Sequence, residues 1–343
     1  MKIFIILLMC AFILIGCGNK SNEQNQVKGK MVVTDEKSTT SEIAQNVTPA
    51  IVGVLSINGS DESVGAGVCV NEDGYVVTNY HVIAGHDKIV LYLSDGSTTG
   101  AELKYKDSNM DIAILKANTT LPYLKIAEDE VEVGEDVLAV GTPISLLLQH
   151  SFTKGIVSAV NRTLKVSTSS GEAYMQNLIQ HDASLNSGNS GGPLINEKGE
   201  IVGINTLKIS GGEGIGFAIP VKTFNSLLNN IITDINYIAP YVGLYGYDAE
   251  IAYFSKQTNE KDGVYVLELS EDSPLKKADA RAGDVITSIN GVKVKTITDF
   301  RNQLYKQKSG ESIKVELVRD GKLYSADIVL EKHPVNNVVG EKR

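Results

Sequence analysis

The sequence has few cysteines, no tryptophan and no excess of basic residues. Its 343 residues include three cysteines, and the formal net charge at pH 7 is −9. This acidic balance argues against non-specific nucleic-acid binding, which depends on basic patches. With 42% hydrophobic and 21% charged residues, the composition is that of a globular protein able to bury a core. The length indicates about two domains.

The few cysteines exclude a disulfide framework. Cys10 and Cys17 belong to an N-terminal stretch in which Lys2 precedes an apolar run over residues 3–15. The run is shorter than the roughly 20 residues of a membrane-spanning helix, and it fits the apolar region of a secretory signal. Cys69 therefore has no intramolecular partner. Because it lies in an apolar run, we expect it to be a small buried core residue.

The end of the N-terminal run predicts a lipid anchor. Residues 14–17 read LIGC, which resembles the bacterial lipobox, in which the cysteine is lipidated and becomes the first residue. Residues 1–17 are then a lipoprotein signal peptide, and Cys17 fixes the chain to the membrane surface. The alternative is an uncleaved apolar anchor. Both readings place the body of the chain outside the cytoplasm.

The rest of the chain divides into a tether, two folded units and a tail. Residues 18–45 are polar without an aromatic residue, which predicts a flexible tether. Over residues 46–235, short β-type runs alternate with turns, which is typical of an all-β sandwich or barrel, and a helix follows Pro220 to about Asp234. Residues 240–332 mix strands with a helix over residues 298–306 and a hairpin at Asp320-Gly321. Residues 333–343 form a polar tail.

Three motifs supply the candidate chemistry of the first unit. They are TNYHV at residues 78–82, DIAIL at 111–115 and GNSGGPL at 188–194. A serine hydroxyl needs an adjacent base, and that base needs a group to orient it. His81, Asp111 and Ser190 supply these three groups in the order found in chymotrypsin-like proteases. The sequence therefore predicts His81 as base, Asp111 as its orienting group and Ser190 as nucleophile.

Other readings of the serine motif are weaker. GNSGG also matches the nucleophile elbow of α/β-hydrolases, but that fold places its Asp and His downstream, where the only histidine here is His333 in the tail. A plain glycine-rich turn and the rival hydroxyl of Ser187 stay open on this segment alone. In the protease reading, the N–H groups of Gly188 and Ser190 form an oxyanion hole. Glycine at position 188 permits the unusual backbone dihedrals of such a turn.

The flanks of these motifs resemble the HtrA (Deg) family of trypsin-fold serine proteases over nearly the whole mature chain. The resemblance implies a mainly β fold, in which a chymotrypsin-like double β-barrel precedes one PDZ domain of the α+β class. It implies a small apolar S1 pocket formed by Leu185, Ile215 and Phe217, which favours cleavage after valine or a similar residue. No cofactor is expected. The five histidines are scattered without metal-ligand spacing, so no metal site is expected either.

For the second unit, the resemblance implies recognition of C-terminal peptides. Tyr241, Val242, Gly243 and Leu244 would form the loop whose N–H groups hold a peptide carboxylate. We thus expect a lipid-anchored, ATP-independent endopeptidase outside the cytoplasm that cleaves misfolded or regulatory exported proteins, with activity controlled by the PDZ domain. The family implies a homotrimer. The alternative is a PDZ-based peptide-binding or chaperone-like module with vestigial proteolysis.

Some positions depart from the family pattern. Tyr80, Met110 and Ser187 replace residues that the family usually carries beside its catalytic positions, and the loop over residues 141–154 is atypical. None of these differences removes a catalytic atom. The segment over residues 57–63 is short, whereas cage-forming relatives carry a long insertion there. A short loop, one PDZ domain and an anchor together resemble the DegS-type branch.

Overall fold

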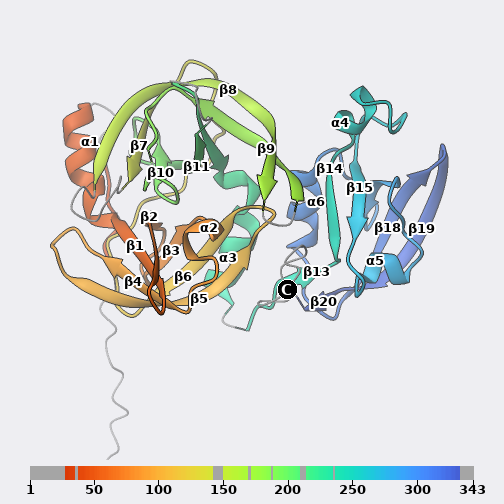
Figure 1. Cartoon of the computed structure of the whole chain (residues 1–343), viewed down its shortest axis with the longest axis horizontal. Helices are drawn as coiled ribbons and strands as arrows, with labels where there is room; N and C mark the ends of the chain where they lie inside the picture. Colours follow the sequence, from red (N-terminus) through yellow and green to blue (C-terminus); the bar gives the residue numbers. More distant parts are fainter. Residues whose placement is uncertain are drawn as a thin grey trace, which may run out of the picture.

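The computed structural model describes residues 28–34, 38–141, 150–168, 171–186, 188–208, 214–234 and 236–332. In Figure 1 two β-barrels lie on one side, and a further sheet with its helices lies on the other. The predicted signal peptide, Cys17, Ser187 and the tail over residues 333–343 lie outside the described residues.

The first barrel closes in the strand order β1-β2-β3-β6-β5-β4. Its strands are β1 (Ile51–Asn58), β2 (Asp61–Cys69), β3 (Tyr75–Thr78), β4 (Lys88–Tyr92), β5 (Thr98–Asp107) and β6 (Ile112–Ala117). Helix α2 (Tyr80–Ile83) follows β3 directly, and the short η1 (Thr48–Ala50) precedes β1. Cys69 at the end of β2 is fully buried, which confirms its expected place in the core.

The second barrel closes in the order β10-β11-β12-β9-β8-β7. Its strands are β7 (Asp136–Gly141), β8 (Ser151–Thr168), β9 (Gly171–His181), β10 (Pro193–Ile195), β11 (Ile201–Lys208) and β12 (Gly216–Pro220). The pairing of β8 with β9 shifts register at three places, and β9 extends beyond the barrel toward the second domain (Figure 1). The double barrel of the predicted fold class is confirmed.

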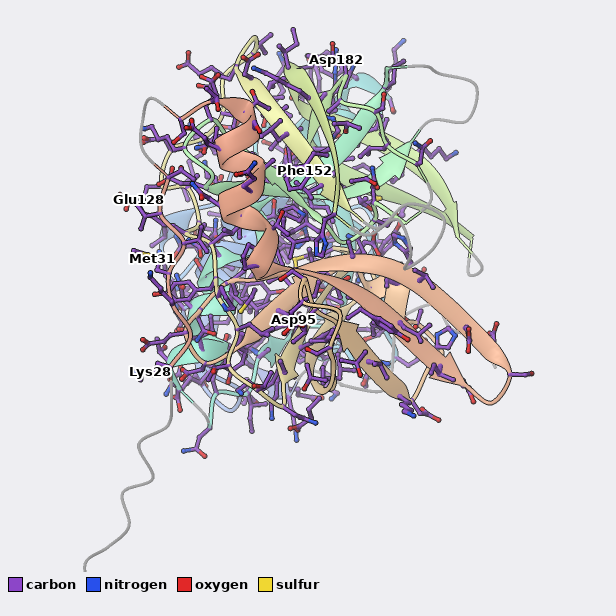
Figure 2. All side chains as sticks on the ribbon, turned by 90° about the vertical axis from the view of Figure 1, so that its left-hand side faces the viewer. Lys28, Met31, Asp95, Glu128, Phe152 and Asp182 are labelled. Carbon is purple, nitrogen blue, oxygen red and sulfur yellow. The ribbon has the colours of Figure 1, made fainter. Side chains whose placement is uncertain are left out.

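The segment before the first barrel differs from the predicted tether. Residues 28–34 lie against the barrels, where Gly29 N–H donates to Glu72 O and Val32 N–H donates to Tyr123 O. Figure 2 shows Lys28 and Met31 along the side of the molecule that also carries Glu128. Helix α1 (Thr40–Val47) then begins inside the expected tether. The prediction of a flexible tether to residue 45 is therefore wrong for this part.

Helix α1 forms for two physical reasons, a capping box at its start and a buried apolar face. Thr39 and Glu42 form a capping box, in which each side chain accepts a hydrogen bond from the backbone of the other residue. Ile43 and Val47 are buried in the main core cluster. Two apolar residues four positions apart were enough to dock one face of this short helix, although the surrounding composition is polar.

The helix predicted after Pro220 is present in two pieces. A 3₁₀ turn, η3 (Val221–Thr223), precedes α3 (Asn225–Thr233). Phe224 between them has φ −130°, outside the helical range, and its side chain is buried in the core. The anchoring of Phe224 explains the interruption, since an unbroken helix would require helical dihedrals at that position.

The second domain contains a sheet in the order β14-β15-β16-β18-β19, in which β17 pairs with β16, and a separate two-stranded sheet of β13 and β20. Helices pack against the larger sheet. Its strands are β13 (Pro240–Tyr241), β14 (Leu244–Asp248), β15 (Val264–Leu269), β16 (Val285–Ile289), β17 (Val292–Lys293), β18 (Ser312–Arg319), β19 (Lys322–Val329) and β20 (Glu331–Lys332). Its helices are α4 (Ala249–Phe254), α5 (Pro274–Lys277) and α6 (Ile297–Leu304). At the predicted hairpin, Asp320 and Gly321 both have positive φ, as a tight β18–β19 turn requires.

Candidate active site

The predicted catalytic residues come from both barrels. His81 lies on α2 and Asp111 directly precedes β6, so both belong to the first barrel. Ser190 lies in the turn before β10 of the second barrel, and its main-chain carbonyl accepts a hydrogen bond from Ala66 N–H on β2. This contact ties the serine turn to the first barrel. His81 lies in the first turn of the short helix α2, directly after β3.

His81 and Asp111, the predicted base and its predicted orienting group, lie within hydrogen-bonding distance of each other. Nδ1 of His81 lies 3.0 Å from Oδ1 and 2.9 Å from Oδ2 of Asp111. The main-chain N–H of His81 also donates to Asp111 Oδ1 at 3.0 Å. The imidazole side chain is 47% exposed, so its other edge is open to solvent. The carboxylate therefore fixes the ring orientation and leaves Nε2 accessible.

Burial and the neighbouring Asp111 have opposite effects on the pKa of His81. Burial lowers the pKa of His81, while the hydrogen bond and negative charge of Asp111 raise it by more, and the net pKa lies above the usual 6.5. A base with a raised pKa accepts a proton more readily. The Asp111 carboxylate therefore stabilises the protonated form of the His81 ring.

Two further side chains hold Asp111. Thr206 on β11 donates its hydroxyl to Asp111 Oδ2 at 2.6 Å, and Asn79 donates its amide to the Asp111 carbonyl at 2.9 Å. Both side chains are buried. The sequence analysis did not single out either residue. Asn79 lies within the TNYHV motif and could have been found there, whereas Thr206 has no local signal.

The hydroxyl of Ser190, the predicted nucleophile, bonds to a main-chain carbonyl in this structure. Ser190 Oγ donates to the carbonyl of Thr206 at 3.1 Å. Within the described part of the chain, no hydrogen bond joins Ser190 Oγ to His81 Nε2. A hydrogen bond from Ser190 Oγ to His81 would therefore require rotation of the Ser190 side chain away from the Thr206 carbonyl. Nucleophile–base contacts are often long in unliganded structures and tighten when substrate binds.

The glycines around Ser190 have distinct physical roles. Gly188 has φ +98°, which side chains rarely adopt, so the predicted conformational role of this glycine is present. A Cβ at Gly191 would collide with Thr78 Oγ1 and Ala66 O, and one at Gly192 would collide with the Val140 carbonyl. The turn therefore packs closely between the barrels. Among backbone contacts of described residues, the N–H groups of Gly188 and Ser190 donate to no carbonyl, as an oxyanion hole needs.

The three residues predicted for the S1 pocket do not meet in one cluster. Leu185 belongs to a second cluster of buried residues of the second barrel, whereas Phe217 and Ile215 pack in the main core cluster. The residue between Ile215 and Phe217, Gly216, lies against Leu185 and His181, so closely that a Cβ there would collide with the His181 ring. His181 is fully buried, and burial lowers its pKa to about 4, so the imidazole is neutral near pH 7. Sequence reasoning did not assign His181 a role.

The predicted peptide-binding loop lies at the start of β14. Gly243 has φ +65°, and a side chain there would collide with Ser270 and Ser273. Ser273 Oγ donates to Val242 O at 2.6 Å, and Ser270 N–H donates to Gly243 O at 2.9 Å. Tyr241 to Gly246 line one side of a cavity of about 80 Å³, and residues of α6 line the other. The loop is thus held rigidly beside a small cavity.

None of the helices in the described part of the chain is long and apolar enough to cross a membrane.

Comparisons with known proteins agree with this architecture. The trypsin-like peptidase domain family matches residues 65–204, and the PDZ domain family matches residues 254–330. The serine protease Do-like HtrA of Bacillus subtilis is 34% identical over 336 residues, which cover 87% of this chain and 74% of the relative. The serine endoprotease DegS of Escherichia coli is 35% identical over 325 residues, or 89% of each chain.

Solved structures give the same result. The crystal structure of the serine endoprotease from Yersinia pestis covers 87% of this chain and 99% of its own, with 31% identity and a TM-score of 0.62. The structure of the HtrA-type protease AlgW with a tripeptide covers 87% of this chain and 98% of its own, with 29% identity and a TM-score of 0.65. The chain therefore belongs to the HtrA family and is a trypsin-fold serine endopeptidase with one PDZ domain.

Proposed function

We propose that His81, Asp111 and Ser190 form the catalytic triad of this endopeptidase. The observation that carries the proposal is the His81–Asp111 pair, with Nδ1 2.9 Å from Oδ2, beside a glycine turn that presents Ser190. Ser190 attacks the scissile carbonyl while His81 Nε2 takes its proton, and Asp111 stabilises the imidazolium. His81 then gives this proton to the leaving amine as the peptide bond breaks, which leaves the acyl group on Ser190. The N–H groups of Gly188 and Ser190 stabilise the oxyanion, and water then releases the acyl group from Ser190 by the same base.

Labelling with a fluorophosphonate tests this assignment. The reagent should modify the wild-type protein and fail to modify Ser190→Ala, because it reacts with an activated serine. His81→Ala should slow labelling strongly, while Ser187→Ala should be labelled like the wild type. Labelling that persists in Ser190→Ala would contradict the triad. Loss of labelling in Ser187→Ala alone would make Ser187 the nucleophile.

We further infer that the PDZ domain binds free C-termini of exported proteins through Tyr241, Val242, Gly243 and Leu244. The rigid loop at Gly243 and the adjoining cavity support this role, because a carboxylate needs N–H groups held in fixed positions. The substrates would be misfolded or regulatory proteins outside the cytoplasm, and ligand binding at this domain would control cleavage. A peptide-library cleavage profile with and without added C-terminal peptides tests both the P1 preference and this control.

Location and assembly are part of the same proposal. The lipobox-like LIGC at residues 14–17 supports lipidation of Cys17 and an anchor on the outer side of the cell membrane. Incorporation of labelled palmitate should vanish in Cys17→Ala, and a label that persists would contradict lipidation there. Family membership supports a homotrimer, which sedimentation of the protein without residues 1–17 would test.

A further inference from the structure

The edge of the PDZ sheet already has a partner in this chain. Strand β14 pairs with β15 on one side and has no strand on the other within the described residues. The side-chain amide of Gln176, on strand β9 of the protease domain, lies against that other edge. Its Nε2 donates to the carbonyl of Gly246 at 3.3 Å, and its Oε1 accepts from the N–H of Asp248 at 2.7 Å.

These bonds copy the pattern of an added β-strand. Main-chain groups on the free edge of a strand belong to alternate residues, here Gly246 and Asp248, because Ala249 N–H points the other way and donates to Gly263 O. A side-chain amide has the same donor and acceptor as a peptide group. Gln176 is 9% exposed, so both of its bonds are largely shielded from water.

Neighbouring residues of β9 hold Gln176 in this position. Tyr174 N–H donates to the Tyr245 hydroxyl at 3.2 Å, and the rings of Tyr174 and Tyr247 lie with centroids 4.7 Å apart. Asn177 donates its amide to Thr298 Oγ1 on α6 at 2.9 Å. Strand β9 thus contacts both β14 and α6, the two walls of the groove, as its approach to them in Figure 1 shows.

The groove between β14 and α6, next to the loop from Tyr241 to Leu244, is small because β9 lies against it. The cavity between β14 and α6 measures about 80 Å³, and Asp107, Tyr174 and Gln176 of the protease domain complete its lining. A cavity of this size has room for a few water molecules. An extended peptide of several residues does not fit unless the contact with β9 opens.

We propose that Gln176 is an intramolecular ligand of the PDZ groove that limits the length of C-terminus it reads. The inference rests on the proposed function of the loop from Tyr241 to Leu244. A peptide with its carboxylate in this loop runs antiparallel to β14, with its last residue facing Leu244. Its third residue from the end then faces Gly246, and its fifth faces Asp248. Gln176 occupies both of those positions.

The partner is therefore a free C-terminus that is read through its last two residues. These two reach the loop without disturbing Gln176. From the third residue inward, a ligand can bond to the Gly246 carbonyl and the Asp248 N–H only by displacing Gln176, so added length brings less net affinity. Opening the contact converts the same groove into a site for a longer extended chain.

Binding of two synthetic peptide libraries to the Ser190→Ala protein tests this length limit. One library has seven randomised residues with a free carboxylate and a fluorescent label. The other has two randomised residues joined to the label by a poly(ethylene glycol) spacer. In Gln176→Ala the affinity for the seven-residue library should rise between about 5-fold and 100-fold, since two competing hydrogen bonds are removed. The two-residue library should bind both proteins equally.

Thr298→Val is the matched control. It removes the hydroxyl that Asn177 contacts on α6 and leaves Gln176 in place. In Thr298→Val, the ratio of the affinity for the seven-residue library to that for the two-residue library should equal the wild-type ratio. Equal gains for both libraries in Gln176→Ala, or no gain for either, would overturn the proposal. If binding ignores amidation of the carboxylate, the groove itself is wrongly assigned and the proposal fails with it.

Hydrogen exchange gives a readout that needs no ligand. The Asp248 N–H should exchange faster in Gln176→Ala, because its only side-chain acceptor within the described residues is lost. The Val266 N–H, which donates to Asp284 O within the PDZ domain, should keep its protection. An unchanged Asp248 rate would contradict the contact in solution, whereas faster exchange at both sites would indicate general unfolding of the domain.

Discussion

Asp111 shows how many functions of the site depend on one residue. It has φ +54°, a conformation that aspartate tolerates better than most side chains. In this conformation its carboxylate reaches both the ring and the main chain of His81, while its own carbonyl accepts from Asn79. Backbone strain of this kind persists where surrounding contacts over-determine it. The orienting residue is thus itself oriented from several sides.

Thr206 provides the first prediction. Thr206→Val keeps the shape of the side chain but removes the hydroxyl that donates to Asp111 Oδ2 at 2.6 Å. A hydrogen bond to a charged group contributes about 1.5–3 kcal/mol, so kcat should fall by at least about 10-fold. Steady-state cleavage of a peptide substrate measures this. Thr206→Ser should recover most of the rate, and equal rates for Thr206→Val and wild type would contradict a positioning role.

The pH dependence of cleavage provides the second prediction. His81 acts as a base only when neutral, and its pKa is raised above the usual 6.5 by Asp111 against the effect of burial. The plot of kcat/KM against pH should therefore lose activity on acidification, with a midpoint above 6.5. In Asp111→Asn this midpoint should move down as the rate falls. A wild-type midpoint below 6.5 would show that another group controls the acid limb.

At the residue scale, the candidate site residues that could be predicted from the sequence are those that lie in local motifs. His81, Asp111 and Ser190 each have characteristic flanks, so they could be identified without coordinates. Thr206 could not, because a threonine on a strand has many ordinary roles and its contact with Asp111 spans 95 positions of the chain. The contact of Ser190 Oγ with the Thr206 carbonyl depends on a side-chain rotation, which no sequence pattern specifies.

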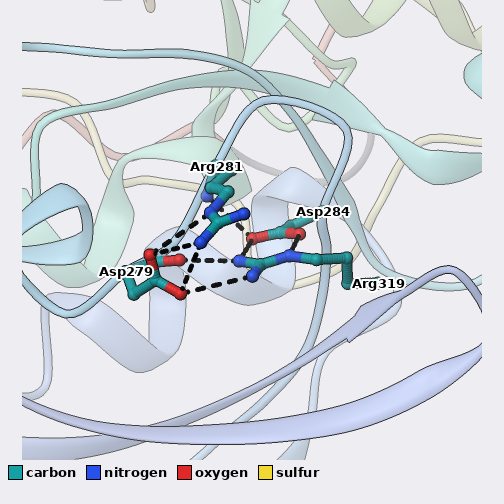
Figure 3. A network of polar contacts seen from close by, with 4 residues as sticks. All are labelled: Asp279, Arg281, Asp284 and Arg319. Carbon is teal, nitrogen blue, oxygen red and sulfur yellow. Dashed lines mark hydrogen bonds and ion pairs between the residues drawn. The ribbon is translucent and has the colours of Figure 1, made fainter.

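At the element scale, a side-chain network shapes the PDZ domain. Arg319 at the end of β18 donates from Nε and Nη2 to the two carboxylate oxygens of Asp284, at 2.6 and 2.8 Å. Figure 3 shows how Asp279 and Arg281 extend the network on its outer side. Asp284 is 1% exposed and also accepts from Arg281 N–H. The loop before β16 is therefore fixed to β18 by an ion pair whose carboxylate is buried.

Removal of the Arg319 cation beside the buried Asp284 carboxylate is the third prediction. Arg319→Met leaves the Asp284 carboxylate buried without its counter-ion, so the PDZ domain should lose about 3–5 kcal/mol of stability. Arg281→Met is the control, because its side chain is 63% exposed. An exposed pair contributes roughly 0–1 kcal/mol. Thermal unfolding followed by circular dichroism measures both. Similar losses in the two variants would contradict a special role for burial.

Elements were predictable where a local rule was strong. The hairpin at Asp320-Gly321 follows from a turn signal between two apolar runs, and α6 follows from helical spacing of Phe300 and Leu304. The helix α1 was missed because its two buried residues, Ile43 and Val47, stand in a polar stretch. Its existence depends on the barrel surface that covers them, and a surface formed by distant strands has no local signal.

At the scale of the whole molecule, the two domains share a core. Tyr305 at the end of α6 is 4% exposed and belongs to the main hydrophobic cluster of the protease barrels. Its hydroxyl lies 3.3 Å from that of Tyr105 on β5, and its carbonyl accepts from Asn230 at 2.6 Å and from Tyr237 at 3.1 Å. The sequence predicted both domains but not this junction, since Tyr105 and Tyr305 are 200 positions apart.

Because the junction is a packed core, the domains should unfold together. Tyr305→Ala removes the ring that joins them, at a cost of about 3–5 kcal/mol for a buried aromatic residue. Scanning calorimetry should show one transition for the wild type and two for Tyr305→Ala, the earlier one from the PDZ domain. Tyr305→Phe keeps the ring and loses only the hydroxyl contact, about 1 kcal/mol, so it should retain one transition. Two transitions in the wild type would mean that the domains are stable independently and that the contacts of β9 with β14 open without disturbing either core.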